Sequence, residues 1–348
     1  MTLKRTFHIE SLSAELVEPL QHKINNKTKP LGSLGVLERT ALRIGQIQET
    51  LTPTLSRPTV LVFAGDHGIA TEGVSPYPQE VTRQMVLNFL AGGAAINVFA
   101  RQHDMELFVI DAGVNGDLPE HPQLLKRKVA PGTKNFLREP AMTPEQCEQA
   151  ISTGADVARQ VRQNGCNILV CGEMGIGNTS AASIILSQLG DFPVENCVGP
   201  GAGLANPGVK KKIEILQAAI RNHRIGDNPF QVLTTFGGLE IAMICGAYLQ
   251  AAQERMIILV DGFISTSALL VASRLYPAVL DYCIFGHQSE EPGHRKMLEL
   301  LRGEPLLRLN MRLGEGTGAV VAYALVESAV RFLNEMASFE SAGVSTAS

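Results

Sequence analysis

This sequence of 348 residues lacks the charge blocks and the long apolar runs that are typical of nucleic-acid-binding and membrane proteins. It contains no block of five or six like charges, and its formal net charge is -4, so we expect no surface for nucleic acid or for an anionic membrane. No run approaches about eighteen uninterrupted apolar residues, which argues against a membrane-spanning helix. These absences favour a protein whose partners are small molecules, with no nucleic acid and no membrane among them.

Cysteine pairs of the CxxC type are also absent. The six cysteines are scattered, and several lie in apolar segments, which is typical of reduced thiols rather than of a disulfide framework. Residues 1–16 include basic residues but lack the unbroken apolar region of a signal peptide. We therefore expect a cytoplasmic protein.

Helical and strand-like segments alternate along most of the chain. Apolar residues keep helical spacing through residues 11–50, with a break at 29–35 (KPLGSLG), and again at 294–302 and 316–336. Between these regions, short apolar runs are separated by helical segments, which predicts strands buried on both faces of a largely parallel sheet. The expected strands are at residues 58–64, 106–111, 167–171, 256–260 and 280–285.

The two ends of the chain contain helices without strands, so they could together form a smaller helical domain. We divide the chain into an N-terminal helical part at residues 1–55, a large α/β domain at 56–295 and C-terminal helices at 296–337. Residues 338–348 are small and polar and are expected to form a frayed, flexible tail.

Each expected strand is followed by glycines and by polar or charged residues. In an open α/β sheet, ligands bind outside the carboxyl ends of the strands, so this chemistry should converge on one edge of the sheet. The charged and imidazole side chains at these positions include Asp66, His67, Glu173, Asp261 and His287.

Residues 172–180 (GEMGIGNTS) form a glycine-rich segment between a strand and a helix. The N–H groups at the start of a helix, with the hydroxyls of Thr179 and Ser180, can hold a phosphate. A kinase or a dehydrogenase is disfavoured, because the Walker lysine and the complete dinucleotide fingerprint are both absent. The segment taken alone could equally be a tight turn.

A second glycine cluster at residues 199–204 (GPGAGL) precedes three consecutive lysines at 210–212. A phosphate could rest on the glycine backbone with one lysine as its counter-charge. The alternative is a flexible loop followed by a solvated basic face. We expect that alternative to be correct for two of the three lysines.

Residues 313–319 (LGEGTGA) place the carboxylate of Glu315 among three glycines, just before an apolar helix. Glycines allow a tight backbone there, or the close approach of a ligand to the carboxylate. Glu315 could instead cap the helix and interact with its dipole. The pattern alone leaves both roles open.

Two further groups of polar residues have alternative interpretations. Asp66 could bind a ribose or orient His67, near an aromatic slot at residues 75–77, but joining neighbouring loops is the preferred interpretation for His67.

His287 and His294 suggest a metal, yet a Pro-Gly break separates them and no third ligand has a recognisable spacing. We predict no metal site.

Seven motifs, in order, resemble those of the nicotinate-nucleotide–dimethylbenzimidazole phosphoribosyltransferase family, and the match spans nearly the whole chain. Any one of them is weak evidence, whereas their common order makes coincidence implausible. They are residues 29–35, 64–69, 172–179, 237–240, 261–264, 287–294 and 312–319.

The resemblance implies a homodimer with a Rossmann-like sheet and a small helical domain built from both ends of the chain. The implied substrates are nicotinate mononucleotide and 5,6-dimethylbenzimidazole, and no cofactor is implied. Transfer of the phosphoribosyl group to the base, with inversion at the anomeric carbon, would give α-ribazole 5'-phosphate and nicotinate for the lower ligand of cobalamin. A binding protein that senses a nucleotide or a corrinoid precursor stays an alternative, and it would not need Glu315.

The same resemblance implies roles for individual residues. Glu315 would act as the general base toward the benzimidazole N–H, and Glu173 would hold the ribose or stabilise positive charge on the sugar. The family often has Arg and Thr where this chain has Pro200 and Ala202, so a nucleotide contact could be lost or supplied elsewhere. The residues implied to bind the phosphoribosyl part are Gly175, Gly177, Asn178, Thr179, Gly203, Lys212 and Asp66. Those implied to lie near the acceptor base are Ser75, Tyr77, Gln84, Met174 and Leu313.

Overall fold

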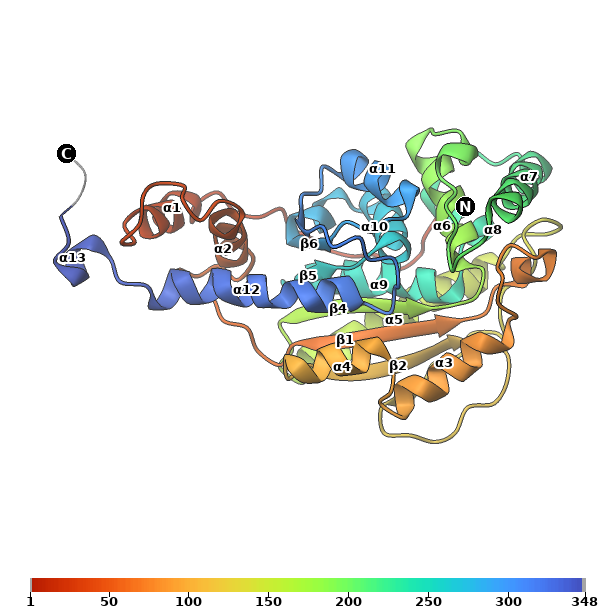
Figure 1. The fold of residues 1–348 in the computed structure, drawn as a ribbon, viewed down its shortest axis with the longest axis horizontal. Helices are drawn as coiled ribbons and strands as arrows, with labels where there is room; N and C mark the ends of the chain where they lie inside the picture. The colour runs from red at the N-terminus through yellow and green to blue at the C-terminus, as the bar shows by residue number, and fades with distance from the viewer. Residues whose placement is uncertain (1, 346–348) are drawn as a thin grey trace.

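The computed structural model describes residues 2–345, and its centre is a parallel sheet of seven strands in the order β3-β2-β1-β4-β5-β6-β7 (Figure 1). The predicted α/β fold with a parallel, helix-flanked sheet is therefore confirmed. The strands are β1 (Thr59–Gly65), β2 (Glu106–Gly113), β3 (Leu124–Lys126), β4 (Ile168–Met174), β5 (Ile257–Val260), β6 (Cys283–His287) and β7 (Pro305–Leu307).

The five strands expected from the apolar runs all form, within a few residues of their predicted limits. The two edge strands, β3 and β7, were not predicted. Each has only three residues, and none in β7 is fully buried. Strands of three residues contain too few consecutive apolar residues to be recognised from the sequence, and their pairing depends on the neighbouring strand.

Helices cover both faces of the sheet. On one face α3 and α4 lie against β2, and α12 lies against β4 to β7. On the other face α9 lies against β1, β2, β4 and β5, with α5 and α10 packed beside it. No helix among residues 2–345 is long and apolar enough to cross a membrane. The helices of eight or more residues are α1 (Val17–Asn25), α2 (Val36–Ile47), α3 (Glu80–Leu90), α4 (Ala95–Gln102), α5 (Pro144–Gln163), α6 (Asn178–Gly190), α7 (Asn206–His223), α8 (Pro229–Phe236), α9 (Leu239–Gln253), α10 (Phe263–Leu275), α11 (Pro292–Leu301) and α12 (Thr317–Glu335). Residues 2–345 also contain three 3-10 helices: η1 (Gly68–Glu72), η2 (Val194–Asn196) and η3 (Pro277–Tyr282).

Helices from the two ends of the chain pack together beside the sheet, at the left of Figure 1. Leu20 and Ile24 of α1, Ala41 of α2, and Ala329 and Leu333 of α12 form an apolar cluster separate from the main core. The 19 residues of α12 span about 28 Å, so this one helix reaches from the sheet to the small helical part. The domain limits at residues 55 and 295 stay predictions.

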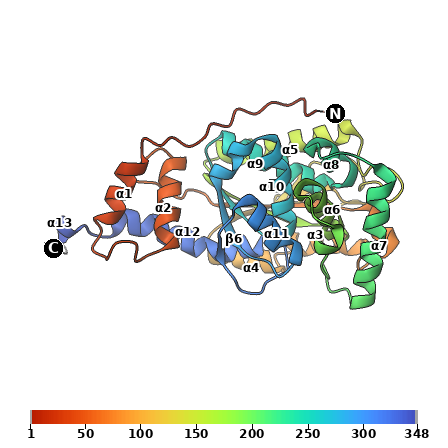
Figure 2. The same cartoon turned by 90° about the horizontal axis from the view of Figure 1, so that it is seen from above.

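The N-terminal segment differs from the helix expected from residue 11, because α1 begins only at Val17. The residues before it run in an extended path across the large part of the molecule (Figure 2). Arg5 bonds to Ser152 of α5, and the N–H of Leu12 bonds to the Asp281 carboxylate. These long-range hydrogen bonds override the helical spacing of the first apolar residues.

The segment expected to be a frayed tail begins with a short helix. The short helix α13 (Phe339–Ala342) is capped by the Ser338 hydroxyl, and the N–H of Phe339 donates to the carbonyl of Asn26. Ser338 also forms a β-bridge with Lys27. The last part of the expected tail, residues 346–348, lies outside the described residues.

The order of the strands places a switch point at the centre of the sheet. The chain proceeds from β1 to β2 on one side, and later from β4 to β5 on the other, while β1 and β4 are direct neighbours. Connections therefore diverge at the carboxyl ends of β1 and β4, which is where ligands bind in open α/β sheets. Asp66 directly follows β1, and Glu173 lies in the last part of β4.

Candidate active site

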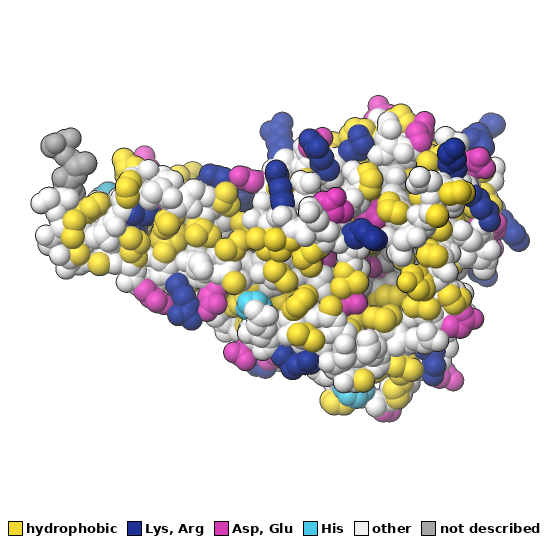
Figure 3. All heavy atoms as spheres, viewed as in Figure 1, with side chains coloured by type: hydrophobic (Ala, Val, Ile, Leu, Met, Phe, Trp, Pro, Cys, Tyr) yellow, Lys and Arg dark blue, Asp and Glu magenta, His cyan; other side chains and the backbone are white. Residues whose placement is uncertain are grey.

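A cavity of about 390 Å³ opens at the carboxyl ends of β4, β5 and β6. Its walls come from the β4–α6 loop, from α3, from the start of α10, from the residues after β6 and from the segment before α12. Figure 3 shows a hollow in this face beside the start of α12, with acidic side chains at its edge. The cavity lies next to the switch point of the sheet.

Glu315 lies at this cavity in a strained backbone conformation. Its φ is 66°, and the glycines on either side also have positive φ, 91° at Gly314 and 92° at Gly316. The glycines adopt this region freely, whereas a residue with a side chain does so at a cost of about 1–2 kcal/mol. The Glu315 carbonyl packs directly against Gly172 of β4, where any side chain would overlap it.

The Glu315 carboxylate is only 6% exposed, and it accepts a 3.2 Å hydrogen bond from the N–H of Ile96 in the first turn of α4. Burial raises the pKa of this carboxyl, the Ile96 N–H opposes part of the rise, and the negative charge of Asp261 adds to it. A raised pKa makes Glu315 a better proton acceptor. The sequence left open whether Glu315 caps the helix that follows it. The structure shows that its carboxylate bonds to the first turn of α4 and not to α12.

Glu173 lies beside the Glu315 turn, close enough that a Cβ on Gly314 would overlap its carboxylate. Burial raises the pKa of Glu173 to about 8, with further contributions from the negative charges of Asp261 and Glu240. The side-chain amide of Asn178 donates to the carboxylate and opposes part of this rise. The cavity therefore contains two carboxyl groups whose proton affinity is raised by their surroundings.

The β4–α6 loop brings the first turn of α6 to the cavity. An added Cβ at Gly175 would overlap the carbonyl of Gly65, so only glycine allows the loop to lie on the end of β1. The helix then begins after Gly177, whose φ of 99° favours glycine. Asn178 and Thr179 line the cavity at the helix N-terminus, where the helix dipole favours an anion.

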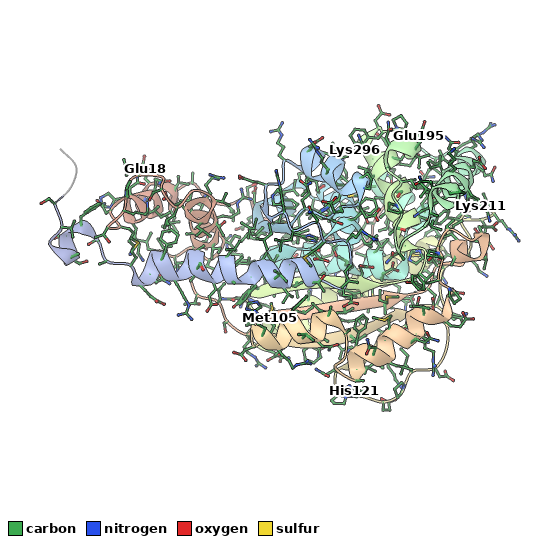
Figure 4. The ribbon with its side chains drawn as sticks, viewed as in Figure 1. Glu18, Met105, His121, Glu195, Lys211 and Lys296 are labelled. Carbon is green, nitrogen blue, oxygen red and sulfur yellow. The ribbon has the colours of Figure 1, made fainter. Side chains whose placement is uncertain are left out.

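One lysine of the three at residues 210–212 is buried. Lys212 is 1% exposed and its Nζ donates a 2.8 Å hydrogen bond to the Thr179 hydroxyl, while burial lowers its pKa to about 8. Lys210 and Lys211 are exposed, and Figure 4 shows Lys211 pointing away from the molecule at α7. Lys212 is therefore placed to add positive charge behind Thr179.

The second glycine cluster closes the same side of the cavity. Gly201 and Ala202 line it, and the Arg312 guanidinium donates a 3.3 Å hydrogen bond to the Gly201 carbonyl. Glu291 is buried there, and both of its carboxylate oxygens lack hydrogen-bond partners among the described residues. Burial raises the pKa of Glu291, opposed by the charge of Lys212.

Several other residues that line the cavity are apolar or aromatic. They include Tyr77, Val81 and Met85 near or on α3, together with Met174 and Leu313. Tyr77 is 52% exposed and Leu313 is 58% exposed, so the cavity is open where these two residues lie. A flat, apolar ring would find suitable contacts there.

The structure brings together only part of the predicted set of site residues. Those that line the cavity are Glu315, Glu173, Gly175, Asn178, Thr179, Tyr77, Met174 and Leu313, and Lys212 is joined to it through Thr179. Those outside the lining are Gly177, Gly203, Asp66, Ser75 and Gln84. Their proposed contacts with substrate stay predictions.

Asp66 and His67 lie behind the β4–α6 loop rather than in the cavity. Asp66 is 1% exposed and accepts a 2.7 Å hydrogen bond from the N–H of Asn115, while burial raises its pKa. His67 is fully buried with Nε2 2.6 Å from the Glu240 carboxylate, in contact with the Gly175 and Gly238 backbones. His67 thus joins neighbouring segments, which is the interpretation that the sequence favoured.

Asp261 and His287 line the cavity as well, although the sequence indicated no role in the reaction for either. His294 lies behind them, with Nδ1 accepting the N–H of Ser289 and Nε2 3.0 Å from the Thr266 hydroxyl. Burial lowers the pKa of His294 to about 3, so this ring is neutral. Within residues 2–345, no group of three or more His, Cys, Asp or Glu side chains is arranged to hold a metal ion.

Other lining residues were missed by sequence reasoning. They include Val81, Met85, Phe263, Ile264, Ser289, Glu291 and Arg312. Phe263 and Ser289 follow strands β5 and β6, so the rule that ligands bind at strand ends could have found them. Val81 and Met85 are one helical turn apart on α3, which identifies a face of the helix but not the cavity that it covers.

Comparisons with known proteins give one consistent result. Residues 9–344 match the model of a family described as Phosphoribosyltransferase. The chain is 57% identical over 343 residues to the nicotinate-nucleotide–dimethylbenzimidazole phosphoribosyltransferase of Dechloromonas aromatica, covering 98% of this chain and 99% of that one. It is 50% identical to the protein of the same name from Parabacteroides distasonis, with 97% and 98% covered. The crystal structure of CobT from Thermus thermophilus superposes with a TM-score of 0.93 at 46% identity, over 96% of this chain and 100% of that one.

Proposed function

Because this chain belongs to the nicotinate-nucleotide–dimethylbenzimidazole phosphoribosyltransferase family and is therefore a pentosyltransferase, we propose that it carries out the reaction for which its relatives are named. It moves the 5-phosphoribosyl group of nicotinate mononucleotide to 5,6-dimethylbenzimidazole. The products are α-ribazole 5'-phosphate, used for the lower ligand of cobalamin, and nicotinate.

The observation that carries this proposal is that Glu315 lines a cavity whose other residues suit both a phosphate and an apolar base. The α6 N-terminus, Thr179 and the nearby Lys212 suit a phosphate. Apolar side chains such as Met85 and Met174 suit a planar base. A carboxylate that shares the cavity with both can serve as the proton acceptor that the attacking base needs.

In the proposed mechanism, one ring nitrogen of the benzimidazole attacks the anomeric carbon while the bond from that carbon to the nicotinate nitrogen breaks. Glu315 accepts the proton from the other ring nitrogen. The pyridinium leaving group takes the bonding electron pair and needs no proton, so the protein has to supply alignment, a dry pocket and one base. Attack from the opposite face inverts the configuration and gives the α-linked product.

Glu173 is proposed to hold the ribose or, in its ionised form, to stabilise positive charge that develops on the sugar. Its carboxyl group lies beside the Glu315 turn, and its pKa, raised by burial to about 8, marks a group that the fold holds away from water. The proposed phosphoribosyl contacts are completed by Gly175 and Asn178, and by Gly177, Gly203 and Asp66 in a substrate-bound arrangement. Ser75, Tyr77, Gln84 and Leu313 are proposed to border the acceptor base.

We further propose that the enzyme works as a homodimer in the cytoplasm. Hydrophobic side chains gather along α12 and beside α2 in Figure 3. On α12, Val321 and Leu325 are only half-buried and Ala324 is exposed. A partly exposed apolar strip of this kind supports association with a second copy. Light scattering checks this proposal, with an expected mass twice that of the 37.4 kDa chain.

The direct test incubates purified protein with nicotinate mononucleotide and dimethylbenzimidazole, without added metal, and follows nicotinate and ribotide together. Equal amounts of both products are expected. Glu315→Gln should bind the mononucleotide with unchanged affinity and lose turnover by about 100-fold or more, as expected for loss of a general base. A protein that binds the mononucleotide but releases no nicotinate would instead be a nucleotide-binding protein.

A further inference from the structure

The carboxylate of Asp261 is bonded to the start of α12, although the two lie far apart in the sequence. Asp261 follows β5 and is 2% exposed. Its Oδ2 accepts a 3.1 Å hydrogen bond from the N–H of Gly316, and its Oδ1 accepts a 3.0 Å hydrogen bond from the N–H of Ala319. This carboxylate therefore connects the central sheet to the helix that directly follows Glu315.

These two hydrogen bonds replace a cap that α12 lacks in its own sequence. The helix begins after Gly316, which has no side chain and makes no cap bond. In a capping box, one side chain accepts the N–H of the third helical residue and a second accepts the N–H of the cap residue. Asp261 does both with one carboxylate, and its charge also suits the positive end of the helix dipole.

The need for an external cap follows from the backbone of the turn. Gly314, Glu315 and Gly316 all have positive φ, so the segment before α12 cannot be held by an ordinary first helical turn. Glu315 is the one member of the three whose side chain makes this conformation costly. The N–H and the hydroxyl of Thr317 donate to the Gly314 carbonyl within the segment. From outside it, the Asp261 carboxylate bonds directly to the residue after Glu315.

His287 fixes Asp261 in turn. Its Nε2 lies 3.4 Å from Oδ1 of Asp261, and the imidazole ring lies against Gly318 so closely that a Cβ there would overlap it. The ring is 3% exposed, and its Nδ1 has no hydrogen-bond partner among the described residues. The buried His287 ring therefore makes its polar contact through Nε2, with Asp261. The ring itself packs against the first turn of α12.

We propose that Asp261, held by His287, is a positioning residue that keeps the turn bearing Glu315 in the conformation in which its carboxylate faces the cavity. The inference rests on the proposed function, because it assigns Asp261 a purpose in the reaction of Glu315. It also makes a separate structural claim, that the turn at residues 314–316 loosens when Asp261 loses its charge.

The functional test is a double-mutant cycle of Asp261→Asn and Glu315→Gln, with both kcat and the dissociation constant of nicotinate mononucleotide measured. Asp261→Asn should lower kcat by about 100-fold, the loss expected when a reacting group is misplaced by about 1 Å, with mononucleotide affinity changed by less than about threefold. In the Glu315→Gln background the same change should reduce kcat by less than about threefold, because both variants remove one function. An equal loss in both backgrounds would overturn the proposal.

The matched control is Thr266→Val, which alters a buried residue of α10 that touches His294 and not Asp261. It should leave kcat within about threefold of the unmodified protein. His287→Asn provides a second variant that keeps the Asp261 carboxylate, and it should give a smaller kcat loss of the same kind. If Asp261→Asn does not fold, the cycle is run with His287→Asn, and additivity with Glu315→Gln would be the contrary result.

A hydrogen-exchange measurement tests the structural claim without any need for turnover. The amides of Gly316 and Ala319 should exchange at least about tenfold faster in folded Asp261→Asn than in the unmodified protein, because each loses a charged acceptor. Amides of α9 should be unaffected. Unchanged exchange at residues 316 and 319 overturns the positioning role, whereas full activity of Glu315→Gln overturns the general-base assignment and leaves this result standing.

Discussion

Because the pKa of Glu173 is raised, replacing this residue by glutamine should stabilise the folded protein while it lowers activity. The Glu173 carboxyl group is 7% exposed, and burial raises the pKa from 4.5 to about 8. The folded state therefore binds this proton more tightly than the unfolded state does. The stability contributed by the protonated group is fully present below pH of about 4.5 and is lost as the pH rises to about 8.

The magnitude follows from the size of the shift. One pKa unit corresponds to about 1.4 kcal/mol, so the rise to about 8 corresponds to roughly 5 kcal/mol of unfolding free energy. Glutamine cannot ionise, and its side-chain oxygen can still accept the hydrogen bond from Asn178. Glu173→Gln should thus gain stability relative to the unmodified protein by roughly 3–5 kcal/mol between pH 5 and pH 9, while losing turnover.

The assay is urea unfolding at each pH from 5 to 9, followed by circular dichroism because the chain has no tryptophan. Burial also raises the pKa values of Asp66, Asp111, Glu291 and Glu315 and lowers those of Lys212 and His294, so the absolute stability of both proteins changes with pH for other reasons as well. Only the difference between them isolates Glu173.

The control for this experiment is Glu195→Gln, at an exposed position that Figure 4 shows on the surface near α6. Its stability difference from the unmodified protein should stay the same at all five pH values. A difference between Glu173→Gln and the unmodified protein that is equally constant from pH 5 to pH 9 would refute the reasoning, because it would mean that Glu173 titrates alike in the folded and unfolded states.

Three further predictions concern separate parts of the molecule. Lys212→Met removes the buried cation behind Thr179 and should weaken mononucleotide binding by about 10–100-fold in calorimetry; unchanged affinity would exclude Lys212 from the phosphate site. Gly154→Ala should lower the free energy of unfolding by about 1–3 kcal/mol in urea, because its Cβ would overlap the Met243 carbonyl where α5 meets α9; equal stability would show that these helices can separate at no cost. All six cysteines are buried and burial raises the pKa of Cys147 to about 12, so an aromatic disulfide reagent should label no thiol before unfolding; rapid labelling of the folded protein would contradict this.

The sheet was largely predictable, because its central strands carry their own signal. A strand buried on both faces has to be apolar at nearly every position, and β1 and β5 are completely buried. The edge strands β3 and β7 lack that requirement, so their existence depends on β2 and β6 beside them. The extended segment before α1 was mispredicted for a similar reason, since hydrogen bonds to distant residues decide its path.

The position of the site was predictable in outline, and its internal geometry was not. Parallel strands bring their carboxyl ends to one edge, so the polar residues after β4, β5 and β6 had to lie near one another. No spacing in the sequence indicates that Asp261 caps α12. The two segments are far apart in the chain, and they meet because β5 and β6 pack against that helix. The orientation of Glu315 depends on that contact.

By itself, then, the sequence determined the parallel sheet, the edge at which ligands bind and the glycines that allow close approach there, since each follows from local chemistry and from the direction of the strands. Only the tertiary structure decided which of those residues share a cavity, which lysine is buried, and that Glu315 caps α4 rather than α12. The physical reason is that distance and burial arise from contacts between segments far apart in the chain, and these set the proton affinity of each carboxyl group.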